Sequence, residues 1–206
     1  MTTLTNKTAS PDQTILYYDK NAADFVTTTQ SVDFHEVQEI FLSYLPDKEV
    51  HILDFGCGSG RDAKAFKEKG YQVTAADGSE EICRAASEYL DMPVRHMLFQ
   101  ELSEKNIYDG IWACASILHL PKKELPDVIF KMRDALKDDG VIYTSFKYGT
   151  FEGERNGRYF TYFTEKSLDE LLAQIPGLQM EKLWITGDVR EGRGDERWLN
   201  VILRKR

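Results

Sequence analysis

The sequence predicts an α/β fold in which a mostly parallel β-sheet is covered by helices and ends in an antiparallel hairpin. Strand-like and helix-like segments alternate from Val50 onward, which is typical of parallel strands joined by crossing helices. An apolar segment at 52–55 runs into a glycine-rich turn, and a helix-like segment follows it. The last two strand-like segments have no helix between them, so we expect them to pair antiparallel.

Local signals set the expected elements in order. Residues 11–46 look helical and end at Pro46. After them, the expected strands are 50–55, 71–76, 94–99, 108–116 and 141–146, and the expected helices are 62–69, 79–90 and 121–136. Gly70 stops the first of these helices, Ser79 is the expected N-cap of the second, and residues 138–140 end the third. The tail adds a helix at 166–175 and strands at 178–186 and 196–203.

Length and composition favour one domain. The chain has 206 residues, of which 42% are hydrophobic and 12% aromatic, and this is ample for a core. We expect a single domain over 1–206, with a helical cover at 1–46, a ligand-binding core at 47–206 and an insertion near 147–163. The first ten residues are rich in Thr, Ser and Asn, and we expect them to fray.

Charge and cysteine content restrict the partners and the compartment. The net charge of -8 argues against a broad nucleic-acid surface, which would be basic. Cys57, Cys83 and Cys114 form no CxxC pair, and neither a signal peptide nor a long apolar span is evident. These features predict a reduced, cytoplasmic protein that has no membrane partner and is a monomer or homodimer.

The glycine-rich turn at 56–60 is the most informative feature of the chain. Glycines allow a backbone to lie directly against a ligand, because no side chain occupies the space. A dinucleotide fingerprint has the spacing Gly-x-Gly-x-x-Gly. Here the spacing is Gly56-x-Gly58-x-Gly60, and Arg61 stands in place of the third fingerprint glycine. The shorter repeat suits a nucleotide-like ligand that has no pyrophosphate.

Residues 53–60 resemble motif I of the class I S-adenosylmethionine (SAM)-dependent methyltransferases. In that family the loop holds the methionine part of the cofactor, which implies contacts from Asp54, Gly56, Cys57, Gly58 and Gly60. Arg61 is either a contact of the methionine carboxylate or a solvated helix residue. The resemblance implies a Rossmann-like three-layer α-β-α sandwich, whose seven-stranded, mostly parallel sheet ends in an antiparallel hairpin. It also implies an N-terminal helical cover over the cofactor.

A second acidic residue supports a ligand that contains ribose. Asp77 ends the strand expected after the turn, at the distance from the glycine loop that suits a ribose-binding acid. A carboxylate there can accept hydrogen bonds from both ribose hydroxyls. The family uses this position, here followed by Gly78 and Ser79, for that purpose. The alternative for Asp77 is an N-cap of the next helix, for which Ser79 is the better candidate.

The resemblance also implies cofactor contacts at Phe99, Gln100, Ala115, Ser116, Tyr18 and Thr29. Phe99 can stack on the adenine, and the amide oxygen of Gln100 can accept from its exocyclic amine. The alternative for this pair is a core phenylalanine beside a surface glutamine. The segment that holds Ala115 and Ser116 matches the family segment beside the transferable methyl group.

His119 is the candidate catalytic residue, because a histidine can accept a substrate proton near neutral pH. The alternative is a structural histidine that bonds the backbone near the start of a helix. The surrounding segment lacks the Asn/Asp-Pro-Pro-Tyr/Phe signature of methyltransferases that act on amino groups of nucleic-acid bases.

The insertion at 147–163 is the candidate substrate region. It carries aromatic and cationic residues that suit a small, partly apolar and anionic substrate, namely Lys147, Tyr148, Arg158 and Tyr159. Arg190, Arg193 and Arg197 can join them from the loop of the last hairpin. The alternative is a solvated loop whose charges are neutralised by nearby acidic residues.

Together these features predict a SAM-dependent methyltransferase that acts on a small molecule and releases S-adenosylhomocysteine. The chain resembles the small bacterial proteins labelled tellurite-resistance-like methyltransferases. No metal-ligand cluster is evident. Three alternatives remain open: a tRNA or other nucleic-acid methyltransferase, an NAD(P)-dependent oxidoreductase, and a non-catalytic SAM-binding module.

Overall fold

Seven strands form one sheet in the order β3-β2-β1-β4-β5-β9-β8 within the part of the chain that the structure describes. This computed structural model describes residues 11–206 apart from 48, 191 and 193. The strands are β1 (His51–Phe55), β2 (Gln72–Asp77), β3 (Arg95–His96), β4 (Tyr108–Ala113), β5 (Leu136–Lys147), β8 (Leu178–Gly187) and β9 (Arg197–Lys205). The first five are parallel, whereas β9 runs antiparallel to both β5 and β8. The predicted sheet and its closing hairpin are therefore confirmed.

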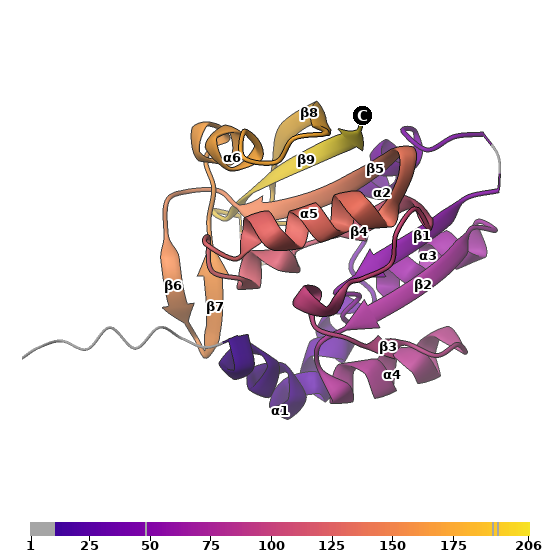
Figure 1. Cartoon of the computed structure of the whole chain (residues 1–206). Helices are drawn as coiled ribbons and strands as arrows, with labels where there is room; N and C mark the ends of the chain where they lie inside the picture. Colours follow the sequence, from indigo (N-terminus) through magenta and orange to yellow (C-terminus); the bar gives the residue numbers. More distant parts are fainter. Residues whose placement is uncertain (1–10, 48, 191, 193) are drawn as a thin grey trace, which may run out of the picture.

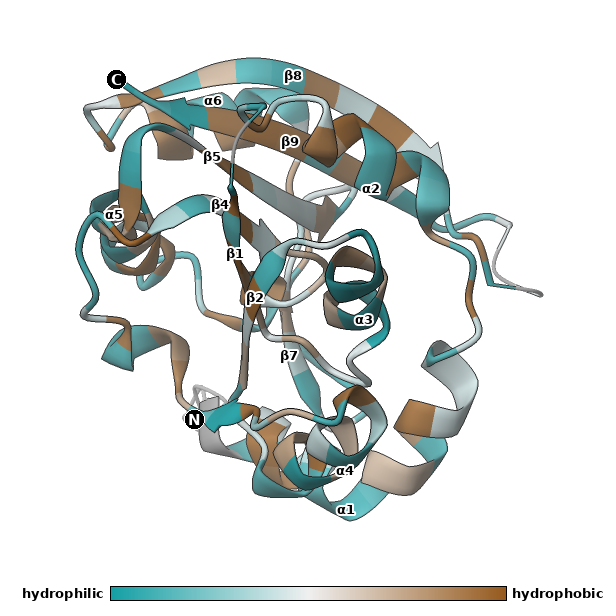
Figure 2. Ribbon diagram, turned by 90° about the vertical axis from the view of Figure 1, so that its right-hand side faces the viewer, coloured by the Kyte–Doolittle hydropathy of each residue, from teal (hydrophilic) through white to brown (hydrophobic). Residues whose placement is uncertain are grey.

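Helices cover both faces of the sheet. Successive side chains of a strand point to opposite faces, so apolar strand residues pack against the helices on each side. The helices are α2 (His35–Leu42), α3 (Arg61–Glu68), α4 (Glu80–Leu90), α5 (Leu125–Ala135) and α6 (Glu165–Leu172). One face packs Leu53, Ile111 and Ile142 with residues of α5 and α6. The other face packs Ile52, Trp112 and Tyr143 with residues of α2 and α3. Figure 2 shows α5 on one side of the sheet and α3 on the other, which gives the three layers.

The strand expected at 94–99 is reduced to the two residues of β3, so that prediction was wrong in extent. These residues pair with Ala76 and Asp77 at the very end of β2. Both are exposed at the edge of the sheet, so no buried alternation extends the strand. The chain then turns into a short 3-10 helix, η1 (Phe99–Glu101).

Residues 138–140 do not end a helix, contrary to expectation. α5 ends at Ala135, and β5 begins at the next residue. Leu136 pairs with Tyr108, and Val141 pairs with Gly110, so the intervening residues of β5 form a bulge. Asp139 adopts a left-handed φ of 61° there. An Asp-Asp-Gly sequence suits a bulge as well as a helix end, and pairing with β4 decides between them.

The insertion after β5 folds into a second, two-stranded sheet of β6 (Glu152–Arg155) and β7 (Arg158–Thr161). The strands are joined by Asn156 and Gly157, whose φ values are 53° and 75°. Asn-Gly in this conformation is a preferred two-residue hairpin turn. It was the local signal for this hairpin, and the sequence analysis did not use it.

Helix α1 (Pro11–Thr29) bridges α4 and the β6–β7 hairpin, as Figure 1 shows. At one end, the Thr14 hydroxyl oxygen accepts a 2.9 Å hydrogen bond from the Tyr159 amide. Further along, Asp19 Oδ1 accepts a 2.6 Å hydrogen bond from the Ser79 hydroxyl and a longer one of 3.4 Å from the Glu81 amide. A carboxylate at the first turn of α4 is favourable, because the helix N-terminus carries partial positive charge. No helix in the described ranges is long and apolar enough to cross a membrane.

We predict that Asp19→Ala loosens the docking of α1 on α4. The substitution removes a charge-assisted hydrogen bond worth about 1.5–3 kcal/mol. Hydrogen exchange of the α1 amides should therefore accelerate by roughly tenfold or more, while the amides of β4 stay protected. Asp24→Ala is the matched control, since Asp24 lies exposed on the same helix. Equal exchange in the two variants would contradict this anchoring role.

Candidate functional site

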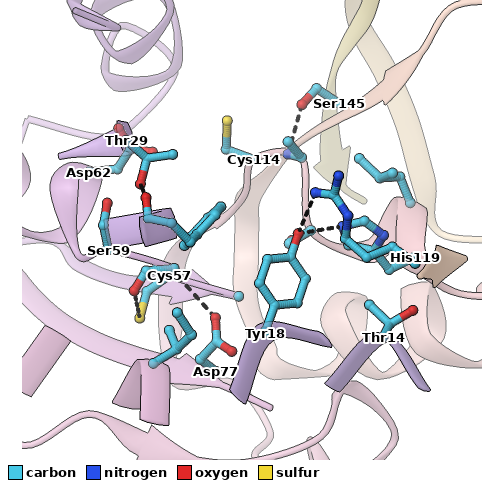
Figure 3. Close-up of a pocket in the computed structure, with 18 of the residues that line it drawn as sticks. Thr14, Tyr18, Thr29, Cys57, Ser59, Asp62, Asp77, Cys114, His119 and Ser145 are labelled. Carbon is cyan, nitrogen blue, oxygen red and sulfur yellow. Dashed lines mark hydrogen bonds between the residues drawn. The ribbon is translucent and has the colours of Figure 1, made fainter. Parts of the chain in front are cut away.

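A cavity of about 230 Å³ lies at the carboxyl ends of β1, β2, β4 and β5, between these ends and α1. It is lined by the loop after β1, by the residues after β2 and β4, by β7 and by the connection from β8 to β9. Carboxyl ends of parallel strands are where α/β sheets bind ligands. Figure 3 shows Tyr18 between Asp77 on one side and His119 on the other.

The glycine loop is held against the end of β2 by backbone hydrogen bonds. The amides of Gly56 and Cys57 both donate to the Ala76 carbonyl, at 2.8 and 2.9 Å. Gly56 has a φ of +83°, and a Cβ there would lie 2.4 Å from Ser116 Cβ. The residue must be glycine for packing and for conformation, and the loop backbone forms part of the cavity wall.

Asp77 connects this loop to the start of α4. Its carboxylate accepts hydrogen bonds from the Gly58 amide and the Ser79 amide, each at 3.0 Å. Burial raises the pKa of Asp77, although these amides favour its charged form. The N-cap of α4 is Ser79, whose Oγ accepts a 3.2 Å hydrogen bond from the Ile82 amide. The N-cap prediction for Ser79 is therefore confirmed, and the Asp77 carboxylate lies on the cavity wall.

Asp62, a buried carboxylate beside the loop, was not among the predicted site residues. It accepts hydrogen bonds from Gln38 Nε2 at 2.6 Å, from Trp112 Nε1 at 3.0 Å and from two guanidinium nitrogens of Arg61 at 2.7 and 2.9 Å. Arg61 lies on the Phe34 ring, 4.7 Å from its centroid. Burial by itself would lower the pKa of Arg61, but the negative charge of Asp62 raises it. Arg61 lines the cavity, but its guanidinium is committed to Asp62.

Most of the predicted site residues meet at this cavity. Those that line it are Tyr18, Thr29, Gly56, Cys57, Gly58, Arg61, Asp77, Gly78, Phe99, Gln100, Ala115, Ser116, His119, Lys147, Arg158 and Arg190. The Phe99 ring meets the Phe55 ring edge-on at 4.9 Å, and Gln100 Nε2 donates to Glu124 at 3.1 Å. Ala115 has a left-handed φ of 49°, a strained conformation of the kind that clusters at functional sites.

Five predicted residues are not part of the cavity wall: Asp54, Gly60, Ser79, Tyr148 and Tyr159. Asp54 is only 2% exposed, and burial, with Asp62 nearby, raises its pKa well above the usual value. The Tyr148 hydroxyl donates to Glu165 at 3.0 Å, and its ring lies under Arg197. Arg197 therefore does not join the cavity. Arg193 lies outside the described residues.

Strand alternation explains why Tyr159 is absent from the wall. Arg158 and Phe160 of β7 line the cavity. The intervening Tyr159 side chain instead donates its hydroxyl to Glu152 at 3.0 Å. Its backbone carbonyl still contributes, because it bonds His119.

His119 is held in one tautomer. Its Nδ1 lies 2.6 Å from the Tyr159 carbonyl oxygen, which can only accept, so Nδ1 carries the proton. Its Nε2 therefore accepts from the Tyr18 hydroxyl at 3.0 Å. Burial lowers the pKa of His119 to about 4, helped by the charges of Arg158 and Lys147. Burial also raises the pKa of Tyr18, so both groups are neutral at pH 7.

Two further cations of the cavity wall are paired with carboxylates. Lys147 forms an ion pair with Glu196. Arg190 donates from Nε to Asp188 at 2.8 Å, and Trp198 Nε1 donates to the same carboxylate at 3.1 Å. Burial opposes ionisation of Asp188, yet these donors hold its pKa at about 2. No group of three metal-ligating side chains occurs in the described part of the chain.

The sequence is similar to those of known methyltransferases. The sequence model of a family described as "Methyltransferase domain" matches residues 52–140. A methyltransferase of Staphylococcus carnosus is 25% identical over 158 residues, which cover 70% of this chain and 76% of the relative. A ubiquinone biosynthesis O-methyltransferase of Rickettsia typhi is 25% identical over 114 residues, or 53% of this chain but only 46% of that protein.

A solved structure shares the fold over almost the whole chain. The 1,6-didemethyltoxoflavin-N1-methyltransferase of Burkholderia thailandensis, solved with 1,6-didemethyltoxoflavin and S-adenosylhomocysteine bound, superposes with a TM-score of 0.77 at 22% identity. The superposition covers 98% of this chain and 93% of that one. The central part of the chain thus matches a methyltransferase domain, and the whole chain has the fold of this solved SAM-dependent methyltransferase.

Proposed function

We propose that this methyltransferase acts on a small molecule held between the glycine loop and the β6–β7 hairpin. The observation that carries the proposal is the continuity of the cavity, which runs from Gly56 to Arg158 past Tyr18 and His119. The Burkholderia protein supports this, because its structure contains both the cofactor product and a small-molecule acceptor.

The cofactor would lie along the glycine loop with its ribose at Asp77. Phe99 and Gln100 line the cavity and would meet the adenine, and Thr29 lines it from α1. The Asp77 carboxylate already accepts two amides, but a carboxylate has about four acceptor positions and can still accept ribose hydroxyls. The absence of side chains at Gly56 and Gly58 lets the backbone approach the methionine part closely.

SAM supplies a methyl group that is already activated by its positively charged sulfur. The residues of this chain need to align the acceptor and exclude water, and α1 would do both by closing over the cavity. In the transfer, a lone pair of the acceptor forms a bond to the methyl carbon, and the carbon–sulfur bond breaks with its electron pair going to sulfur. If the acceptor carries a proton, it would pass through the Tyr18 hydroxyl to His119 Nε2, which accepts a hydrogen bond from that hydroxyl.

Several properties support the small-molecule proposal over the alternatives. The net charge of -8 and the missing base-methyltransferase signature count against a nucleic-acid acceptor. All three cysteines are free, which is consistent with the proposed cytoplasmic location. The proposal also includes a single domain and a monomer or homodimer. The tellurite-resistance-like subgroup stays a prediction.

We predict that Asp77→Ala weakens binding of S-adenosylhomocysteine, because it removes the proposed acceptor for the ribose hydroxyls. Loss of hydrogen bonds to a charged group should raise the dissociation constant roughly 10- to 100-fold, measured by calorimetry. Asp127→Ala, at an exposed position of α5, should leave the affinity unchanged. An unaltered affinity in Asp77→Ala would remove the ribose role, and binding of NAD instead would refute the cofactor assignment.

We predict that His119 does not titrate near neutral pH. The unfolded chain binds a proton below about pH 6.5, whereas folded His119 stays neutral until about pH 4. The unfolded state therefore holds more protons between these values, and the free energy of unfolding should fall as pH falls through this window. Urea unfolding at pH 7 and pH 5 should show a smaller loss of stability for His119→Asn than for the wild type.

The control for this experiment is Thr150→Ala, since Thr150 is exposed and its side chain does not titrate. That variant should lose as much stability between the two pH values as the wild type. Direct observation of the His119 ring by NMR gives a second readout. A His119 titration midpoint near 6.5 would contradict the buried, neutral imidazole.

A further inference from the structure

Arg158 differs from the other cations of the cavity. It is the first residue of β7, directly after the Asn156-Gly157 turn, and its side chain lines the cavity together with Phe160. No carboxylate of the described residues lies within ion-pair distance of its guanidinium, whereas Arg61, Lys147 and Arg190 each have one. No described residue therefore supplies a counter-ion to the positive charge of Arg158 at the wall of the cavity.

The hydrogen bonding of Arg158 is also incomplete. Its Nε is buried and has no hydrogen-bond partner among the described residues. One terminal nitrogen reaches the Tyr18 hydroxyl at a long 3.5 Å. A buried donor without a partner costs about 1–3 kcal/mol, and more when it is charged, so such a group points to a missing acceptor.

Aromatic rings surround the guanidinium but do not replace that acceptor. Its central carbon lies 4.7 Å from the centroid of Tyr17, 5.2 Å from Phe160 and 5.9 Å from Tyr18. Cation–π contacts stabilise the charge by interaction with ring faces. The N–H groups in the guanidinium plane still require oxygen acceptors, and a carboxylate or similar oxyanion matches their fork.

We propose that Arg158 binds an anionic oxygen of the methyl acceptor, which makes planar oxyanions the substrate class of this enzyme. The inference rests on the proposed function, in which this cavity holds a small-molecule acceptor. The rings of Tyr18, Phe160 and Trp198 line the cavity and favour a flat, unsaturated body for the same molecule. His119 is neutral, and Lys147, which packs on the same Phe160 ring as Arg158, is paired with Glu196. Among the described residues, the Arg158 guanidinium is therefore the unpaired positive charge at this end of the cavity.

The test compares matched acids and amides as probes. The protein is first saturated with S-adenosylhomocysteine, then titrated with benzoate or benzamide, and with 4-hydroxybenzoate or 4-hydroxybenzamide, by calorimetry. Each pair has nearly the same shape and differs in charge. We expect the acid of at least one pair to bind roughly 10- to 100-fold more tightly than its amide, as a charge-assisted hydrogen bond implies.

Arg158→Gln should abolish this preference for the acid while S-adenosylhomocysteine still binds. Arg155→Gln is the matched control, because Arg155 belongs to the same hairpin but is exposed and lies outside the cavity wall. Arg158→Lys, which keeps the charge but loses the planar fork, should show a reduced preference. This variant also serves as the second test if Arg158→Gln does not fold.

The outcomes separate this inference from the proposed function. Failure of the wild type to bind S-adenosylhomocysteine would refute the proposed cofactor site. Normal binding of S-adenosylhomocysteine with no acid bound more tightly than its amide would overturn the role of Arg158 alone. A preference for the acid that survives in Arg158→Gln would also overturn it.

Discussion

The end of β2 is the point on which the site depends. The Ala76 carbonyl accepts the amides of Gly56 and Cys57, and the Asp77 carboxylate accepts the amides of Gly58 and Ser79. These bonds set the glycine loop and the first turn of α4 against one another. They form because β1 and β2 are adjacent parallel strands in register, so both strands deliver their following residues to the same edge.

The helical cover depends on the same junction. Ser79 caps α4 with its oxygen and donates its proton to Asp19, which holds α1 against the start of α4. Tyr18, the neighbour of Asp19, then lies between Asp77 and His119, as Figure 3 shows. The Ser79 hydroxyl thus links the proposed ribose site at Asp77 to the helix that carries Tyr18. Tyr18 in turn separates the proposed ribose site from the proposed acceptor site.

Sequence patterns were sufficient for elements whose signals are local. Ser79 marked the start of α4, and the interval between 178–186 and 196–203 marked a hairpin. They were insufficient where pairing with a distant strand decides the conformation. The bulge at 138–140 exists because β5 pairs with β4, and the shortness of β3 follows from its place at the sheet edge. At Asn156-Gly157 the local signal was present but not used.

The sequence by itself predicted the fold class, a SAM-dependent methyltransferase and a set of site residues, most of which line the cavity. Glycine spacing and an acid at a strand end encode these over a few neighbouring positions. The tertiary structure alone decided which charges are neutralised. Lys147 and Glu196 are 49 positions apart, yet they form an ion pair. The sequence does not distinguish Arg158 from the other arginines, but in the described fold its guanidinium contacts aromatic rings and the Tyr18 hydroxyl.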